Sequence, residues 1–491
     1  MISAIQWIKK GVAAQHPQRF KVDEKELELM NQFAADRLGE AKADLEEAQK
    51  ADMEIDSADD SENDSDDQYT DNDGEEHGAS MDHDGQDESK EPSTPRDPND
   101  LSEYNLDDYD KEDENEKKQE PAIFSRPKDL AYYSDEKDDP YVTLSNDVDE
   151  QEELEEMQIL PDDMLLIAAK TEDDVSQLEL YVYEKDADNL YCHHDIMLPS
   201  FPLCLEWLDF HTGEKAGTEG SGNYVAVGTF EPDIEIWDLD VVDNMIPQTI
   251  LGHTDKNKKR SKKANPKYHV DAVMDLSWNK QHRNFLLSSS ADSTVKLWDL
   301  SSSTCAQSYT HHNGKVQAVA WNPAEATVFI SGSYDKSVCA LDARSPQQIT
   351  KWNLVSDIEC VVWDPHNPTN FYVGTEDGVV QYFDVRAADN GVGTKPIFTL
   401  QAHDGAVSAL DINPHFTGCI ATGSTDGKVK VWNTRDNKPS MITSKNFELG
   451  HIFSAKFSID TPFDLALSGS NGNIHVWDMS TNAGIRQAYS S

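Results

Sequence analysis

Segments that end in a Trp-Asp pair or a close variant recur along the C-terminal two-thirds of this chain. The closing residues lie 61, 43, 42, 49 and 45 residues apart. These closing residues are Trp237, Trp298, Leu341, Phe383, Trp432 and Trp477. A period of about 40–45 residues, with short β-rich runs between turns, is typical of propeller blades, each a four-stranded antiparallel sheet. The repeat therefore predicts an all-β propeller with WD repeats.

Further residues repeat in parallel with the closing positions. The first strand of successive repeats ends at Trp207, Trp278, Trp321, Trp363, Ile412 and Phe457. Six positions before the closing residue stand the turn residues Asp292, Asp335, Asp377, Asp426 and Asn471. His403 and His253 fit the position that opens a repeat. Since a turn Asp can accept hydrogen bonds from its own tight turn and from the opening His, we interpret these residues as structural rather than catalytic.

The number of closing strands predicts seven blades. The run Leu178–Tyr183 supplies the seventh closing strand, but no first strand lies beside it in the sequence. Ile2–Ile8 fits that missing strand, with Trp7 in the periodic position. We therefore expect residues 1–14 to form the N-terminal strand of the first blade and residues 161–491 to form the rest of the propeller. Only Trp352 has no place in this scheme.

The segment between these two parts is strongly acidic. The chain has 42 Lys+Arg against 93 Asp+Glu, a net charge of −51, and residues 51–160 alone hold 41 acids and 8 bases. Such a segment has too little apolar surface to offset the entropy of ordering, so we predict a long, disordered acidic insertion over residues 51–160. It either binds basic peptides such as histone tails or only solvates the chain.

One N-terminal helix is predicted ahead of the acidic insertion, in residues 15–50. Apolar residues recur at spacings of three and four from Leu27 to Ala48, and the helix should begin near Glu24. This helix could dock on its own propeller or on a partner, and its pattern fits both.

Several classes of protein are excluded. No apolar run reaches the ~18–20 residues that span a membrane, and residues 1–14 lack a signal-peptide pattern. The six cysteines lie 12 or more residues apart, so a CxxC knuckle is excluded and a reduced intracellular protein is expected. Without a P-loop, GxSxG or HExxH motif, we expect no enzyme and no cofactor. His193 and His194 lie in a predicted strand and should face opposite sides, which makes them a poor metal pair.

A basic run and two serines are the remaining functional signals. The run contains Lys258, Lys259, Arg260, Lys262 and Lys263. It is predicted to be a nuclear import signal, with a phosphate contact and a plain solvated loop as alternatives. Ser57 and Ser61 each precede an acid by three residues, which is typical of acidophilic kinase sites, so both are candidates for phosphorylation.

Several segments together resemble the periodic tryptophan protein 1 family of WD-repeat proteins. They are IQWIKKGVA near the N-terminus, DPYVTL, YCHHDI, IEIWDLD, DLSWN and SGSYDKSV. The resemblance implies a nuclear and nucleolar scaffold in large-subunit precursor assembly and rRNA processing, with pre-ribosomal proteins and precursor rRNA as partners. It also implies the alternative of a histone-binding chromatin factor at rRNA genes. A membrane or a small-molecule substrate is not expected.

Overall fold

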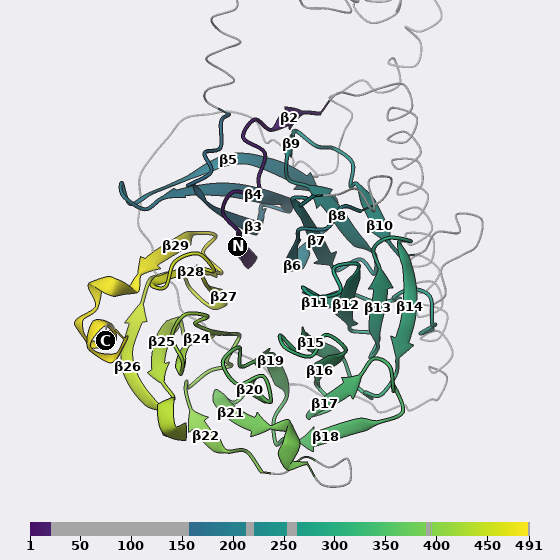
Figure 1. Ribbon diagram of the computed structural model, residues 1–491, viewed down its shortest axis with the longest axis vertical. Helices are drawn as coiled ribbons and strands as arrows, with labels where there is room; N and C mark the ends of the chain where they lie inside the picture. The colour runs from purple at the N-terminus through teal and green to yellow at the C-terminus, as the bar shows by residue number, and fades with distance from the viewer. Residues whose placement is uncertain (21–156, 213–219, 253–262, 389–392, 394, 490–491) are drawn as a thin grey trace, which may run out of the picture. The chain divides into compact units, whose positions relative to one another are not determined.

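Seven antiparallel sheets surround a central axis in the computed structural model, which confirms the predicted seven-bladed propeller (Figure 1). The structure describes residues 1–20, 157–212, 220–252, 263–388, 393 and 395–489. The helix expected from about Glu24 and nearly all of the acidic insertion lie outside these residues. None of the described helices is long and apolar enough to span a membrane.

The first three blades hold the following strands. Blade 1 contains β1 (Ile2–Ile8), β3 (Met164–Glu172), β4 (Val175–Glu184) and β5 (Asn189–Leu198). Blade 2 contains β6 (Pro202–Leu208), β7 (Tyr224–Thr229), β8 (Ile234–Asp238) and β10 (Thr249–Leu251). Blade 3 contains β11 (Val273–Trp278), β12 (Phe285–Ser290), β13 (Val295–Asp299) and β14 (Thr304–Tyr309).

The other four blades continue the same order around the axis. Blade 4 contains β15 (Val316–Trp321), β16 (Val328–Ser333), β17 (Ser337–Asp342) and β18 (Ile349–Asn353). Blade 5 contains β19 (Ile358–Trp363), β20 (Asn370–Thr375), β21 (Val379–Asp384) and β22 (Phe398–Gln401). Blade 6 contains β23 (Ala409–Ile412), β24 (Cys419–Gly423), β25 (Lys428–Asn433) and β26 (Ser440–Asn446). Blade 7 contains β27 (Ile452–Phe457), β28 (Asp464–Gly469) and β29 (Ile474–Asp478).

Burial follows the position of a strand within its blade. The second strands are buried at almost every position, as in β7, because neighbouring blades cover both faces of the sheet. Trp352, which the repeat scheme left unplaced, lies in the fourth strand of blade 4. It is 1% exposed and packs edge-on against Phe371 of blade 5, with ring centroids 5.1 Å apart. Aromatic residues thus fill the wedge between blades on the outer strands as well.

The N-terminus supplies the innermost strand of blade 1, next to the central axis (Figure 1). β1 pairs antiparallel with β3, and Trp7 lies opposite Leu166. The Trp7 Nε1–H donates to the Lys456 carbonyl oxygen of blade 7 at 2.9 Å. The first residues therefore complete blade 1 and join it to the last blade.

Blade 7 departs from the predicted four strands, because it has three. The chain leaves β29 through the 3-10 turn η7 (Met479–Thr481) and ends the described part in the helix α4 (Ala483–Tyr489). Ile485 and Tyr489 of this helix are buried in the core shared by blades 6 and 7. The C-terminal residues therefore cover blade 6 instead of adding a strand. The remaining short elements are η5 (Val385–Ala387), η6 (Arg435–Asn437), and the parallel pair β2 (Gln18–Arg19) and β9 (Val241–Val242).

Candidate functional site

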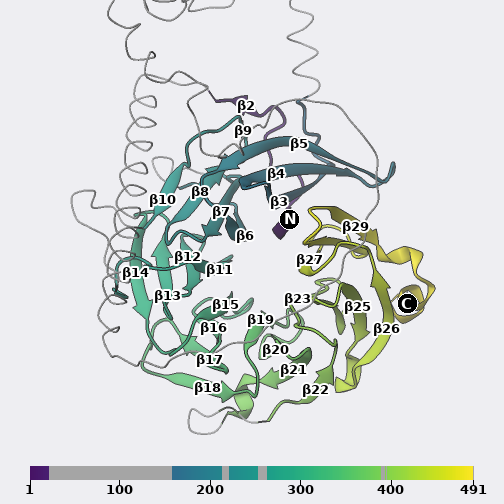
Figure 2. The same ribbon diagram turned by 180° about the vertical axis from the view of Figure 1, so that it is seen from behind.

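The turns of the propeller divide between two rims, because successive strands of a blade alternate in direction (Figures 1 and 2). The His–Asp rim carries the turns between second and third strands and the loops that lead to the next blade, including His269, His312 and His403. The arginine rim carries the remaining turns, including Arg283, Arg344 and Arg386. Rigid loops on a stable scaffold are where binding residues concentrate.

Blades 3 and 6 each have a four-residue hydrogen-bonded corner on the His–Asp rim. In blade 3, His269 Nδ1 lies 2.9 Å from Asp292 Oδ2 and its Nε2 lies 2.7 Å from Ser288 Oγ. The Trp298 Nε1–H donates to the same Ser288 hydroxyl at 2.8 Å. In blade 6, the corresponding corner is formed by His403, Asp426, Thr422 and Trp432. Each corner ties the opening loop, the turn and the Trp-Asp strand together.

These corners suit a structural role. Burial by itself would raise the pKa of Asp292, but hydrogen bonds from His269 and Thr294 outweigh it and lower that pKa to about 2. Burial lowers the pKa of His269, despite its carboxylate partner. At neutral pH the pair is therefore a neutral imidazole and a carboxylate, both engaged by neighbours, and it offers no free base to a substrate.

Two opening histidines were missed in the sequence. His269 and His312 each precede a turn Asp by 23 residues, as His403 does, and this constant spacing is the signal that identifies them. His253, which was expected to open a repeat, lies outside the described residues, and His269 occupies that position in blade 3. The insertion before blade 3 caused the error, since it separates Gly252 from the true opening residue.

The other predicted repeat positions have clear places in the blades. Trp7, Trp207, Trp278, Trp321 and Trp363 lie in innermost strands, and Trp237, Trp298, Trp432 and Trp477 lie in third strands. Asp292, Asp335, Asp377 and Asp426 lie in or beside the turns between second and third strands. Of the basic run, Lys263 alone is described, and Ser57 and Ser61 fall outside the described residues.

Carboxylates on the innermost strands hold neighbouring blades together. Glu206 accepts a hydrogen bond from the Trp278 backbone N–H at 3.1 Å, and Asp275 accepts one from Val319 at 2.9 Å. Asp411 accepts a similar bond from the Phe457 backbone N–H at 2.7 Å. Each bond crosses from one blade to the next, so these acids fix the spacing of the blades.

One lysine lies among these acids. Burial by itself would lower the pKa of Lys456, but the charges of Asp411, Glu206 and Asp275 outweigh it and raise that pKa. Burial raises the pKa of Asp275 to about 7, although its hydrogen bonds and Lys456 act in the opposite direction. These residues come from blades 2, 3, 6 and 7, so they can interact only because their strands surround one axis.

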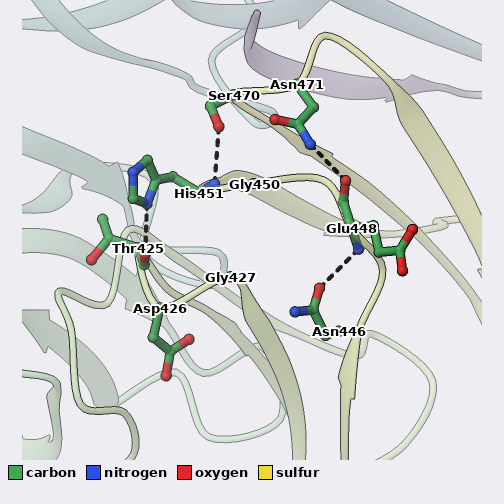
Figure 3. Close-up of a pocket in the computed structure, with 9 residues that line it drawn as sticks. All are labelled: Thr425, Asp426, Gly427, Asn446, Glu448, Gly450, His451, Ser470 and Asn471. Atoms are coloured by element: carbon green, nitrogen blue, oxygen red, sulfur yellow. Dashed lines mark hydrogen bonds between the residues drawn. The ribbon is translucent and has the colours of Figure 1, made fainter.

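A pocket of about 410 Å³ opens on the His–Asp rim between blades 6 and 7 (Figure 3). It is lined by Thr425, Asp426, Gly427, Asn446, Glu448, Gly450, His451, Ser470 and Asn471. Backbone and side-chain hydrogen bonds hold its loops: His451 N–H donates to Ser470 Oγ at 3.0 Å, and Asn471 Nδ2 donates to the Glu448 carbonyl at 2.7 Å. Its lining includes two carboxylates and no Lys or Arg side chain. The pocket therefore suits a basic side chain of a partner.

The opposite rim gathers the arginines. The arginines of the described residues that lie on this rim or in the segments beside it are Arg19, Arg283, Arg344, Arg386, Arg435 and Arg486. Arg344 pairs with Asp342 at 2.6 Å, and Arg386 pairs with Asp384 at 2.8 Å. The Arg344 and Arg386 side chains remain largely exposed, at 73% and 69%. Exposed guanidinium groups in rigid turns are suited to phosphate contacts.

The expectation that the side chains of His193 and His194 face opposite sides of the sheet was wrong. A β-bulge in β5 leaves His193 as an extra residue, since Leu180 pairs with His194 and Tyr181 pairs with Cys192. The bulge cancels the alternation of side chains, and the two Nδ1 atoms lie 2.8 Å apart. Burial first, and then His193, lower the pKa of His194 to about 4.

Acidification from pH 7 to pH 5 is expected to destabilise the protein partly through His194. Its pKa falls from an ordinary 6.5 to about 4 on folding, so the unfolded chain takes up the proton first. The expected loss is ~2 kcal/mol of unfolding free energy. Urea unfolding of the wild-type protein and of His194→Asn at both pH values measures this loss. The variant should lose correspondingly less, and equal losses in both proteins would contradict the assignment.

Comparison with known proteins assigns WD repeats to this chain, in agreement with its propeller fold. The family described as WD domain, G-beta repeat matches residues 262–299, 303–341, 394–433 and 443–478. The second of these matches runs from β14 to β17 and the third from β22 to β25, so one sequence repeat spans two adjacent blades. Each of these two matches begins with the last strand of one blade and ends with the third strand of the next, so each repeat links two blades covalently.

Three relatives assign the chain to one family among the WD-repeat proteins. An uncharacterised WD repeat-containing protein of Schizosaccharomyces pombe is 42% identical, over 100% of this chain and 91% of its own length. Periodic tryptophan protein 1 of Saccharomyces cerevisiae is 36% identical, over 100% of this chain and 90% of its own. The Drosophila melanogaster homolog of periodic tryptophan protein 1 is 31% identical, over 66% of this chain and 69% of its own length. With the propeller and its WD corners in place, this chain belongs to the periodic tryptophan protein 1 family of WD-repeat proteins.

Proposed function

We propose that this protein is a non-enzymatic nucleolar scaffold in large-ribosomal-subunit precursor assembly and rRNA processing. Membership of the periodic tryptophan protein 1 family supports this role through the resemblance noted above. The structural observation that carries the proposal is the division between the rims. Exposed guanidinium groups such as Arg344 and Arg386 lie on one rim, and an acidic pocket lies on the other.

Each rim suits a different partner. The arginine rim presents cations to the phosphates of precursor rRNA. The His–Asp rim presents the exposed Glu448 side chain to basic segments of pre-ribosomal proteins. The His and Asp side chains of the blade corners are buried and hydrogen-bonded to each other, so they are not available as catalytic groups. This favours a scaffold over a hydrolase.

Complementation tests this role directly. Cells depleted of the protein should accumulate precursors of the large-subunit rRNA, and the wild-type gene should restore processing. We expect Arg344→Ala/Arg386→Ala to restore it only partly, because it removes two exposed phosphate contacts but no core residue. Lys315→Ala/Lys336→Ala, on the opposite rim, is the matched control and should restore processing fully. Unchanged precursor levels after depletion would contradict the proposal.

The basic run supports a nuclear location. It lies between β10 and β11, in a connection from one blade to the next. Replacement of Lys258–Lys263 by alanine is expected to shift a tagged protein from the nucleus to the cytoplasm, because an import receptor recognises a cluster of cations. Microscopy of both proteins checks this, and an unchanged nuclear signal would refute the import role.

A histone-binding chromatin factor is the second candidate. The acidic pocket between blades 6 and 7 favours it, since a lysine or arginine of a histone tail could pair there with the exposed Glu448 carboxylate. The acidic insertion over residues 51–160 adds negative charge in the same chain. Phosphorylation of Ser57 and Ser61 would increase that charge and strengthen the attraction for basic partners.

A further inference from the structure

The corner of blade 4 departs from the repeated corner at three positions. The residue before the opening histidine is Tyr268 in blade 3 and Ala402 in blade 6, but it is His311 in blade 4. The closing tryptophan is replaced by Leu341. The residue opposite the corner hydroxyl in the β-ladder is Lys296 in blade 3 and Lys430 in blade 6, whereas blade 4 has Cys339.

Two of these changes bring new donor atoms to one point. His311 Nε2 lies 2.8 Å from Ser331 Oγ, and His312 Nε2 lies 2.9 Å from the same atom. Cys339 is the cross-strand partner of Ser331. One nitrogen or sulfur donor of each of His311, His312 and Cys339 lies within 4.8 Å of the others. The loss of the indole leaves Ser331 free of the tryptophan N–H that the corner hydroxyl receives in blades 3 and 6.

The surroundings of the cluster resemble those of a metal site. Asp335 Oδ2 lies 3.1 Å from His312 Nδ1, and a carboxylate in that place orients an imidazole and makes its other nitrogen a better ligand. His311 Nδ1 is buried and makes no hydrogen bond with any described residue. Cys339 and His312 are 0% and 5% exposed, while His311 is partly exposed and gives a path from the rim.

We propose that His311, His312 and Cys339 bind a zinc ion, with the Ser331 hydroxyl or a water as the fourth ligand. Two imidazoles and one thiolate form a donor set that zinc prefers in tetrahedral sites. Binding releases the thiol proton to solvent as the sulfur–zinc bond forms. A bound ion would stabilise the corner of blade 4, where Leu341 replaces the closing tryptophan.

The corners of blades 3 and 6 have a lysine where the corner of blade 4 has Cys339. The Lys296 ammonium donates to the Asn265 carbonyl at 2.6 Å, and the Lys430 ammonium donates to the Ala402 carbonyl at 2.6 Å. In blades 3 and 6 a lysine therefore stands at the position of Cys339, and its ammonium is held by a backbone carbonyl. In blade 4 the nearest ammonium shown is that of Lys351, which lies 3.7 Å from Asp335 Oδ2. A metal ion is expected in blade 4 and in neither of these corners.

Cobalt and zinc titration of the purified full-length protein, after removal of metal with a chelator, tests the proposal. Cobalt should give a thiolate-to-cobalt charge-transfer absorption in the wild type, and zinc should abolish it. Cys339→Ser should lose this absorption and bind one zinc fewer by elemental analysis. Cys305→Ser, which alters a partly exposed cysteine in β14 of blade 3, is the control and should behave as the wild type.

His311→Tyr keeps the test decisive if Cys339→Ser folds poorly, because blade 3 carries tyrosine at this position. This variant should fold and bind zinc at least ten-fold more weakly. The proposal is overturned if the wild type shows no thiolate-to-cobalt absorption at saturating cobalt, or if folded His311→Tyr binds zinc as the wild type does. Weak zinc binding by the acidic insertion would be common to all the variants and would cancel in the comparison.

Discussion

A chain that begins at Lys9 is expected to lose the cooperative unfolding of the propeller and to be recovered largely as aggregated protein. The deletion removes β1, whose side chains Ile2, Ile5, Trp7 and Ile8 are at most 3% exposed. Full burial of one such side chain stabilises by roughly 1.5–3 kcal/mol, so four contribute roughly 6–12 kcal/mol. That is comparable with the whole stability of a typical domain, about 5–15 kcal/mol.

Loss of ring closure adds to this effect. Without β1, the inner edge of β3 is left unpaired, and the hydrogen bond from Trp7 to the Lys456 carbonyl is lost. Circular dichroism during thermal unfolding, together with the soluble yield, measures the result. Lys9→Ala, which changes an exposed residue just after the strand, is the control and should melt like the wild type. An equal melting temperature for the truncated and full chains would contradict the assignment of β1 to blade 1.

Replacement of Lys456 by methionine is expected to cost roughly 1–3 kcal/mol of unfolding free energy at pH 7, because it leaves partly buried carboxylates without a neighbouring cation. The substitution keeps the length of the side chain but removes a positive charge that acts on Asp411, Glu206 and Asp275. The charge of Lys280 still acts on Glu206 and Asp411. Urea unfolding measures the change. Lys428→Met, in β25 and exposed, should change the stability by less than about 0.5 kcal/mol.

The pH dependence separates lost charge from lost packing. The pKa values of Asp275, Glu206 and Asp411 are already raised by burial, and they should rise further without Lys456. Folded protein then binds more protons than the unfolded chain, so the deficit of Lys456→Met should shrink as the pH falls from 7 to 5.5. A deficit that stays constant over this range would assign the effect to packing.

The blade framework could be predicted from the sequence because large aromatics recur at fixed intervals. Trp7 is the clearest case: a count of first strands required a partner for β3, and the N-terminus supplies it. The same reasoning failed at His193, since a single extra residue in β5 moves a side chain to the other face without changing the composition. The alternation of side chains along a sequence predicts regular strands but does not predict β-bulges.

The candidate sites were less accessible to sequence reasoning. The repeat identifies Leu341 and Asp335 of blade 4, but only the 23-residue spacing from His312 to Asp335 marks the opening histidine. The pocket between blades 6 and 7 combines three loops, so no spacing along the chain marks it. The short helix α4 is stabilised by the burial of Ile485 and Tyr489 and has no strong periodicity of its own.

Crosslinking of the full-length protein to RNA in cells, followed by sequencing and by mapping of the crosslinked peptides, tests the proposed role most directly. The scaffold proposal predicts crosslinks to precursor rRNA of the large subunit, with peptides from the arginine rim around Arg344 and Arg386. Co-purification of histones without precursor rRNA would contradict it and favour the chromatin factor.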